Sequence, residues 1–421
     1  MKGLAALRRY LVKLGPGLIT GAADDDPSGI STYSVAGATT GLSMLWLAIL
    51  TTPMMAVVQG MCARISMVSG QGLAAVLRSR IHPALLYVVA AMVVIANTFN
   101  VGADIAGMAA SANMVTGIAV LVWVIVFGLA LIVIQVYLSY NVFVSVIKWL
   151  CLALFAYVIT AFVVHPDWRH VLASAVVPHV SLTSAWITTL VAVLGTTISP
   201  YLFFWQSALM VEEEKAAGRK TVAERRGATK TEVADAHTDV NTGMLASNLV
   251  MFFIIVTTAS TLGASGSHHI ESAQQAAEAL RPLAGKFAYL LFTLGMVGTG
   301  MLAVPSLVGS SAYLICDVFR LRHGMDEKPH RVPAFYGIIV GGIVAGVLMN
   351  LMRVNPISAL YWSAVANGLA AVPLVILVTI LSNDAKIVGK WRNSPLANVW
   401  ACLAIVTMTG AAIGMFIPWG K

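Results

Sequence analysis

The amino-acid sequence predicts an all-α membrane protein that crosses the bilayer many times. Of its 421 residues, 58% are hydrophobic and only 10% are charged, whereas a soluble protein carries about 25% charged residues. Asp, Glu, Lys and Arg are absent from residues 27–63, 105–147, 170–211, 242–270, 287–316 and 354–383. A membrane-spanning helix needs about 20 mostly apolar residues, so each of these stretches has room for one or two spans.

We expect eleven membrane-spanning helices within a single transmembrane domain, residues 1–421. They cover residues 14–37, 42–66, 84–112, 116–138, 142–164, 183–210, 242–264, 287–316, 333–352, 356–382 and 396–417. The first is the most polar, because Gly, Ser and Asp interrupt its apolar residues. The longest polar segment, residues 211–241, is expected to be a cytoplasmic connector that contains a short helix.

The positions of Lys and Arg predict the orientation. With the N-terminus in the cytoplasm, the cytoplasmic segments are residues 1–13, 64–83, 139–148, 211–241, 317–332 and 383–395. They contain 21 of the 26 Lys and Arg residues, which agrees with the positive-inside rule. We therefore expect a multi-pass protein of the inner (plasma) membrane with an external C-terminus. Its net charge of +8 then reflects contact with anionic lipid, and no nucleic-acid partner is expected.

Two of the predicted spans contain a helix break. Asp26-Pro27-Ser28-Gly29 interrupts the first span, and Pro200 interrupts the sixth within GTTISPYLFFWQSAL, residues 195–209. Proline removes a backbone donor, and the freed backbone groups are tolerated at membrane depth only where protein, water or a ligand satisfies them.

The two breaks occupy corresponding positions if spans one to five and six to ten are inverted repeats. Secondary transporters place their substrate sites at such paired discontinuous helices. The sequence therefore predicts a transporter that works by alternating access. It has no GxxxxGK[ST] phosphate-binding loop, and we expect neither enzymatic activity nor a cofactor.

The residues at the breaks resemble the NRAMP family of proton-coupled divalent-metal transporters. That family has Asp-Pro-Gly-Asn in its first span, and Met-Pro-His followed by a segment ending His-Ser-Ala-Leu in its sixth. This sequence has Asp26-Pro27-Ser28-Gly29 and Ser199-Pro200-Tyr201, ending Gln206-Ser207-Ala208-Leu209. The flanking stretches GPGLITGAA and AGATTG also suit the family. The resemblance covers nearly the whole chain and implies a LeuT-like fold.

Aligned residue by residue, the resemblance keeps one metal ligand and loses two. The metal-binding Asp of the family is Asp26 here, so the resemblance implies that Asp26 binds metal. The metal-binding Asn becomes Gly29, the metal-binding Met becomes Ser199, and the neighbouring His becomes Tyr201.

The third span of the family has an Asp-x-x-Glu pair that serves proton movement. The closest match here, Asp104-Ile105-Ala106-Gly107, keeps the Asp and loses the Glu. A second register places Asn97 and Asn100 at the pair instead. The family's proton pair is therefore incomplete in either register.

The altered ligand set favours a hard cation. A methionine thioether helps a site to select soft transition metals, and Ser199 replaces it. One carboxylate, hydroxyls and backbone carbonyls remain, which suits Mg²⁺, bound partly hydrated in a roomier cavity. This resembles the branch of the family known for magnesium transport. We therefore predict import of Mg²⁺, with Mn²⁺ as the second choice.

A small carboxylate such as citrate, free or as a metal chelate, is the alternative substrate. Half-helices that begin near Pro27 and Pro200 present free amides and the positive end of a dipole, and Tyr201 and Gln206 are then donors. The run Asp24–Asp26 repels an unaccompanied anion. An acid inside the membrane is itself a candidate functional group, so the metal hypothesis comes first.

The candidate site contains three sets of residues. The expected substrate or ion ligands are Asp26, Ser28, Gly29, Thr196, Ser199, Tyr201, Gln206 and Asn367. The expected vestibule or coupling residues are Asp24, Asp25, Asp104, Asn97 and Asn100, and Pro27 and Pro200 make the breaks. We expect a monomer whose partners are the lipid bilayer and a small ion or molecule.

Overall fold

The computed structural model describes residues 15–137, 152–264, 266, 270–352 and 354–419. These residues form helices and no strands, which confirms the all-α prediction. Among them, nine helices are long and apolar enough to cross a membrane. The other two expected spans are the first, which its break divides into two short helices, and the fifth, expected at residues 142–164, which lies partly outside the described residues.

The helix bounds follow the expected spans closely. The broken first span is α2 (Pro16–Asp24) and α3 (Pro27–Thr40), and the broken sixth is α11 (Ser184–Thr197) and α12 (Pro200–Ala216). The remaining spans are α4 (Trp46–Ser69), α6 (Pro83–Thr116), α7 (Val120–Tyr137), α9 (Phe155–Val163), α14 (Lys230–Thr258), α17 (Ala288–Phe319), α18 (Pro333–Met349), α19 (Pro356–Asn383) and α21 (Pro395–Gly414).

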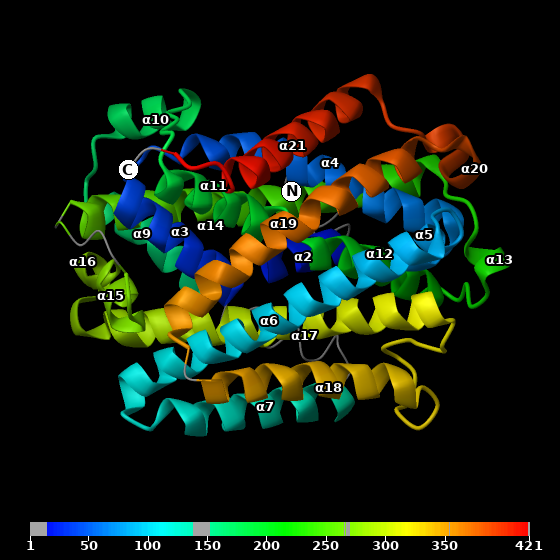
Figure 1. Cartoon of the computed structure of the whole chain (residues 1–421), viewed down its shortest axis with the longest axis horizontal. Helices are drawn as coiled ribbons and strands as arrows, with labels where there is room; N and C mark the ends of the chain where they lie inside the picture. Colours follow the sequence, from blue (N-terminus) through cyan, green and yellow to red (C-terminus); the bar gives the residue numbers. More distant parts are fainter. Residues whose placement is uncertain (1–14, 138–151, 265, 267–269, 353, 420–421) are drawn as a thin grey trace, which may run out of the picture.

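Short helices mark the two ends of the molecule (Figure 1). One end carries α5 (Leu73–Arg78), α13 (Val222–Arg225) and α20 (Ala385–Val388). The opposite end carries α10 (Trp168–Val176), α15 (Ala273–Glu278) and α16 (Arg281–Ala284). The first three belong to segments predicted to be cytoplasmic and the other three to segments predicted to be external, so the connectors are grouped as the charge distribution predicts.

The connector at residues 211–241 differs from the prediction. Most of it belongs to α12, which continues to Ala216, and to α14, which begins at Lys230. The expected separate helix is only the four residues of α13. The reason is local: Thr229 and Glu232 form a capping box that starts α14 well before its apolar residues begin.

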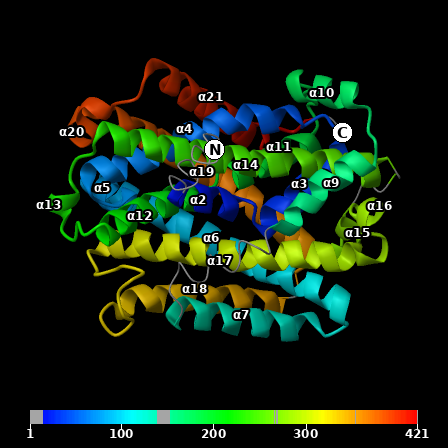
Figure 2. The same ribbon diagram turned by 180° about the vertical axis from the view of Figure 1, so that it is seen from behind.

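The broken first span lies in the middle of the helix bundle. In both views α7 and α18 lie side by side along one edge, with α6 and α17 next to them (Figures 1 and 2). The half-helix α2 lies at the centre and packs against α14, α12 and α17. Polar groups of this first span are therefore enclosed by other helices, away from lipid.

Glycines bring α2 and α14 into backbone contact. A Cβ at Gly17 would lie 2.5 Å from the Val240 amide nitrogen, and one at Gly21 would overlap the Gly243 carbonyl. Small residues at such contacts let membrane helices approach closely. The contact fixes which face of α2 turns toward α14.

The carboxylate of Asp239, on α14, caps the N-terminus of α2. Its oxygens accept hydrogen bonds from the amides of Gly15, Gly17 and Leu18 at 2.8, 2.6 and 3.0 Å. Pro16 has no N–H, so every available amide of this first turn is bonded. The negative charge also lies at the positive end of the helix dipole.

We predict that Asp239→Ala destabilises the protein. The substitution leaves three amides of α2 without their charged acceptor, and hydrogen bonds to charged groups contribute about 1.5–3 kcal/mol. Thermal unfolding of the purified protein in detergent should show a melting temperature several degrees lower. Asp326→Ala, at an exposed position, is the matched control. Equal melting temperatures for the two variants would contradict the capping role.

Candidate functional site

Both predicted helix breaks are present. Between α2 and α3 the chain leaves the helical conformation at Asp25 and Asp26, and between α11 and α12 it does so at Ile198 and Ser199. Pro27 and Pro200 are the first residues of α3 and α12, a position where the missing N–H and the fixed φ angle of proline suit a helix start.

Two tyrosines connect the broken helices to each other. The Tyr201 hydroxyl, at the start of α12, donates to the Ala23 carbonyl near the end of α2 at 2.8 Å. The Tyr33 hydroxyl, on α3, lies 3.2 Å from the Thr197 hydroxyl at the end of α11. The half-helices therefore pair as α2 with α12 and α3 with α11, as expected for inverted repeats.

Asp26 caps a helix at the first break and also places a carboxylate charge there. Its side chain is 2% exposed. One carboxylate oxygen accepts from the Gly29 amide at 2.6 Å and caps α3. The other accepts from the Asn100 amide group at 3.0 Å. A carboxylate has about four lone-pair sites, so both oxygens retain acceptor capacity for a cation.

Oxygen atoms from three segments converge at Gly29. A Cβ there would lie 3.3 Å from the Asp24 carbonyl oxygen, 3.3 Å from the Thr196 hydroxyl and 3.4 Å from a carboxylate oxygen of Asp26. These are a carbonyl at the end of α2, a hydroxyl on α11 and a carboxylate at the start of α3. Without a Cβ, the glycine lets these three oxygens lie close to the start of α3.

Two predicted hydroxyl ligands are engaged elsewhere. The Ser28 hydroxyl bonds to the Leu360 carbonyl and the Ser363 hydroxyl on α19, at 2.9 and 3.0 Å. The Ser199 hydroxyl donates back to the carbonyls of Gly195 or Thr196 on α11, at 2.7 and 2.8 Å. Their hydrogen atoms are therefore directed at protein acceptors.

The third span contributes two residues to the first break. Asn100 donates to Asp26, and Asp104 is one turn further along the same helix, α6. Asp104 is fully buried. Its carboxylate oxygens make no hydrogen bond of good geometry in the described part of the chain, although the backbone amide of Ser28 interacts with the carboxylate. Its carboxylate interacts electrostatically with that of Asp26. Of the residues in the two registers considered for this span, Asn100 and Asp104 both face the first break.

Asn97 points away from this group. Its amide donates to the Leu307 carbonyl and to the hydroxyls of Ser310 and Ser311, all on α17, at distances of 3.3, 3.0 and 2.9 Å. Asn97 therefore joins two packed helices.

The three consecutive aspartates face two different helices, α14 and α6. Asp24 and Asp25 are 0% and 5% exposed, and the Ser247 hydroxyl, on α14, lies 2.6 Å from a carboxylate oxygen of Asp24 and 3.2 Å from one of Asp25. Asp26 instead faces Asn100 on α6. Consequently, the described residues contain no group of three or more His, Cys, Asp and Glu side chains that converges on one metal position.

Gln206 and Asn367 are buried polar residues whose amide groups have unused hydrogen-bonding capacity. Both amide atoms of Gln206 and the amide oxygen of Asn367 have no hydrogen-bond partner among the described residues. Unsatisfied buried groups are costly, and each such group calls for an explanation such as a bound water or ion.

The buried charges around the breaks are all acidic. Asp24, Asp25, Asp26 and Asp104 are buried, whereas the one buried basic residue in the described ranges is Arg225. Arg225 lies in α13 at the end of the molecule and donates to carbonyls there. Buried carboxylates that have no basic side chain beside them strongly favour binding a cation or a proton.

Sequence reasoning missed two kinds of group at the site. The first is Ser247, a single hydroxyl in an apolar span, which nothing in the pattern distinguishes from packing serines. The second is the identity of the backbone carbonyls. The sequence predicts carbonyls in the ligand set, but no side-chain signal indicates those of Ala23 and Asp24. The break itself was the available signal for them, since a helix that ends leaves its last carbonyls unbonded.

Comparison with known proteins adds the family. Residues 17–418 match the family described as natural resistance-associated macrophage protein-like, Nramp. The chain belongs to the Nramp family. It is 24% identical over 417 residues to a protein of Aeromonas hydrophila named divalent metal cation transporter MntH, which covers 97% of this chain and 96% of that relative. A protein of the same name from Erwinia tasmaniensis is 29% identical over 303 residues, 71% of this chain and 70% of that relative.

Solved structures show the same fold as this Nramp protein. The Eremococcus coleocola manganese transporter superposes with a TM-score of 0.71 at 17% identity, over 97% of this chain and 86% of that one. Mhp1, a nucleobase-cation-symport-1 family transporter, gives a TM-score of 0.57 at 14% identity, over 96% of this chain and 91% of that one. The LeuT-like fold and the NRAMP resemblance are both confirmed.

Proposed function

We propose that this Nramp-family protein is a secondary transporter that imports a hard divalent cation, with Mg²⁺ first and Mn²⁺ second. Family membership and relatives named as divalent metal cation transporters support metal transport in general. The choice of a hard cation depends on one observation, the carboxylate, hydroxyl and carbonyl oxygens that converge at Gly29.

The charge of the site supports a cation. Four buried carboxylates lie at or near the first break, and no basic side chain is buried beside them in the described ranges. The carbonyls that end α2 add the negative end of a helix dipole. A positive ion therefore offsets the cost of burying these acids.

The donor atoms support a hard cation. The position that carries the family's methionine is Ser199, and the position that carries its asparagine is Gly29. Oxygen ligands suit Mg²⁺ and Mn²⁺ better than soft metals. Mg²⁺ usually keeps several of its waters and binds through one or two carboxylates, and Asp26 with Asp104 supplies two.

The carboxylate alternative has less support. A free citrate ion would face the same four buried acids without a buried basic partner. A metal chelate of citrate is the form of this alternative that is compatible with the charge of the site.

The transport cycle we propose is alternating access around the two breaks. Both breaks come from one chain, so we propose a monomer as the transport unit, with the N-terminus in the cytoplasm and the C-terminus outside the inner membrane. Asp104, a buried carboxylate that interacts electrostatically with Asp26, is the proposed position for a coupled proton or a second contact to the cation.

We predict that Asp26→Asn abolishes most metal uptake. The amide keeps an oxygen to cap α3 but loses the negative charge, and charge-assisted contacts contribute about 1.5–3 kcal/mol, or about tenfold or more in affinity. Mg²⁺ uptake into proteoliposomes should fall accordingly, while the melting temperature stays close to that of the wild type.

Asp326→Asn, in a loop outside the spans, is the control for Asp26→Asn and should transport normally. Asp26→Ala should also lose uptake, with some loss of stability because the cap is removed. Wild-type uptake by a folded Asp26→Asn protein would show that Asp26 does not bind the substrate.

We predict that the double substitution Gly29→Asn with Ser199→Met shifts selectivity toward Mn²⁺, because it restores an amide and a thioether at the break. The measurement is the ratio of Mn²⁺ to Mg²⁺ uptake in competition. Gly337→Asn, on α18 where a Cβ meets nothing within 4 Å, is the control. An unaltered ratio would show that positions 29 and 199 do not face the substrate.

A further inference from the structure

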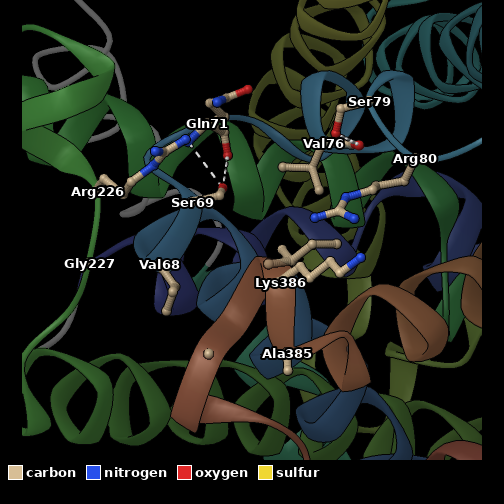
Figure 3. Close-up of a pocket in the computed structure, with 12 residues that line it drawn as sticks. Val68, Ser69, Gln71, Val76, Ser79, Arg80, Arg226, Gly227, Ala385 and Lys386 are labelled. Atoms are coloured by element: carbon tan, nitrogen blue, oxygen red, sulfur yellow. Dashed lines mark hydrogen bonds between the residues drawn. The ribbon is translucent and has the colours of Figure 1, made fainter.

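A polar cavity lies at the end of the molecule that carries α5, α13 and α20. It has a volume of about 390 Å³ and lies between the end of α4, α5, the segment after α13, and α20 (Figure 3). The polar side chains that line it are Ser69, Gln71, Ser79, Arg80, Arg226 and Lys386. All of them belong to segments predicted to be cytoplasmic.

Three positively charged side chains, from three separate segments, line the cavity. Arg80 follows α5, Arg226 follows α13, and Lys386 is in α20. Arg80 forms an ion pair with Asp384 at 3.2 Å. No ion pair joins Arg226 or Lys386 to another described residue. In Figure 3, Arg80 and Lys386 lie on one side of the cavity and Arg226 on the other.

Buried hydrogen bonds hold the wall that carries Arg226. The neighbouring Arg225 is buried, and its guanidinium donates to the Gly70 carbonyl at the end of α4 at 3.1 Å. The Gly227 amide donates to the Val68 carbonyl at 2.9 Å. Arg226 is therefore placed between two fixed neighbours.

The opposite wall is held by one aspartate. Asp384 caps α20 by accepting from the Lys386 amide at 2.8 Å, and the same carboxylate pairs with Arg80. Asp384 thus holds the Arg80 guanidinium and the backbone of Lys386 on the same wall. The three cationic residues are exposed at the cavity, and no ion pair with a described residue balances the charges of Arg226 and Lys386, which favours an anion there.

We propose that this cavity binds a phosphate-bearing anion, either an anionic lipid headgroup or a free phosphate compound. Phosphate offers several oxygens to cations on both sides, and arginine is well suited to it. Because the three segments follow α4, α12 and α19, a bound anion ties these connectors together. The cavity is lined by residues of the predicted cytoplasmic segments, whereas Gly29 is in α3 next to the first helix break. The proposal does not depend on which ion is transported.

The test uses the purified full-length protein in detergent at low ionic strength and without divalent metal. Calorimetry measures binding of sodium pyrophosphate, and separately of short-chain phosphatidylglycerol, with short-chain phosphatidylcholine as the zwitterionic comparison. We expect binding of pyrophosphate, phosphatidylglycerol or both, and none of phosphatidylcholine. Binding of pyrophosphate alone identifies a free phosphate compound as the source, and binding of phosphatidylglycerol alone identifies a lipid.

The decisive variant is Arg226→Gln with Lys386→Gln, which leaves the Arg80–Asp384 pair intact. Its affinity for the bound probe should fall about tenfold or more, since two charge-assisted contacts are lost. The matched control is Arg322→Gln with Lys328→Gln, two exposed cations of the same predicted face that do not line the cavity. Equal weakening in both variants, or no binding of either anion to the wild type, would overturn the proposal.

Discussion

A carboxylate enclosed in the membrane at a break in a helix is the constraint on which the rest of the structure depends. Asp26 is almost fully buried, and its two oxygens are used by the Gly29 amide and by Asn100. Pro27 starts α3 at the break, and Asp26 accepts from the Gly29 amide that the start of α3 exposes. The same segment brings the carbonyl of Asp24 and the hydroxyl of Thr196 close to Gly29. The start of α3 and the position of the candidate ligand Asp26 are therefore coupled.

The half-helix α2 is held at both ends by other spans. Asp239 on α14 binds its first amides, and Tyr201 on α12 binds one of its last carbonyls. Between these points, Gly17 and Gly21 press directly on the backbone of α14. Any movement of α2 relative to α14 must break the Asp239 contacts and separate the glycine interface. An alternating-access cycle that moves α2 relative to α14 therefore requires these contacts to break.

The sequence predicted the span order and both breaks, because charge-free tracts and prolines act over short distances in the chain. The motif residues at the breaks predicted the Nramp family. They also mark Asp26 as a ligand, which stays a prediction. It could not decide how Asn97, Asn100 and Asp104 divide between partners, since that depends on helix rotation. Only the packed structure shows Asn97 bound to α17 and Asn100 bound to Asp26. The partner of Asp24 and Asp25, Ser247, is more than 220 residues away, and no local pattern reports such a contact.

The central claim is that the site takes a divalent cation without citrate, and calorimetry on purified wild-type protein tests it most directly. Mg²⁺, Mn²⁺, citrate and Mg-citrate are titrated separately. The account predicts that Mg²⁺ binds in the absence of citrate and that metal-free citrate gives no binding heat. Binding of citrate without any metal, together with no binding of Mg²⁺ or Mn²⁺ alone, would contradict it.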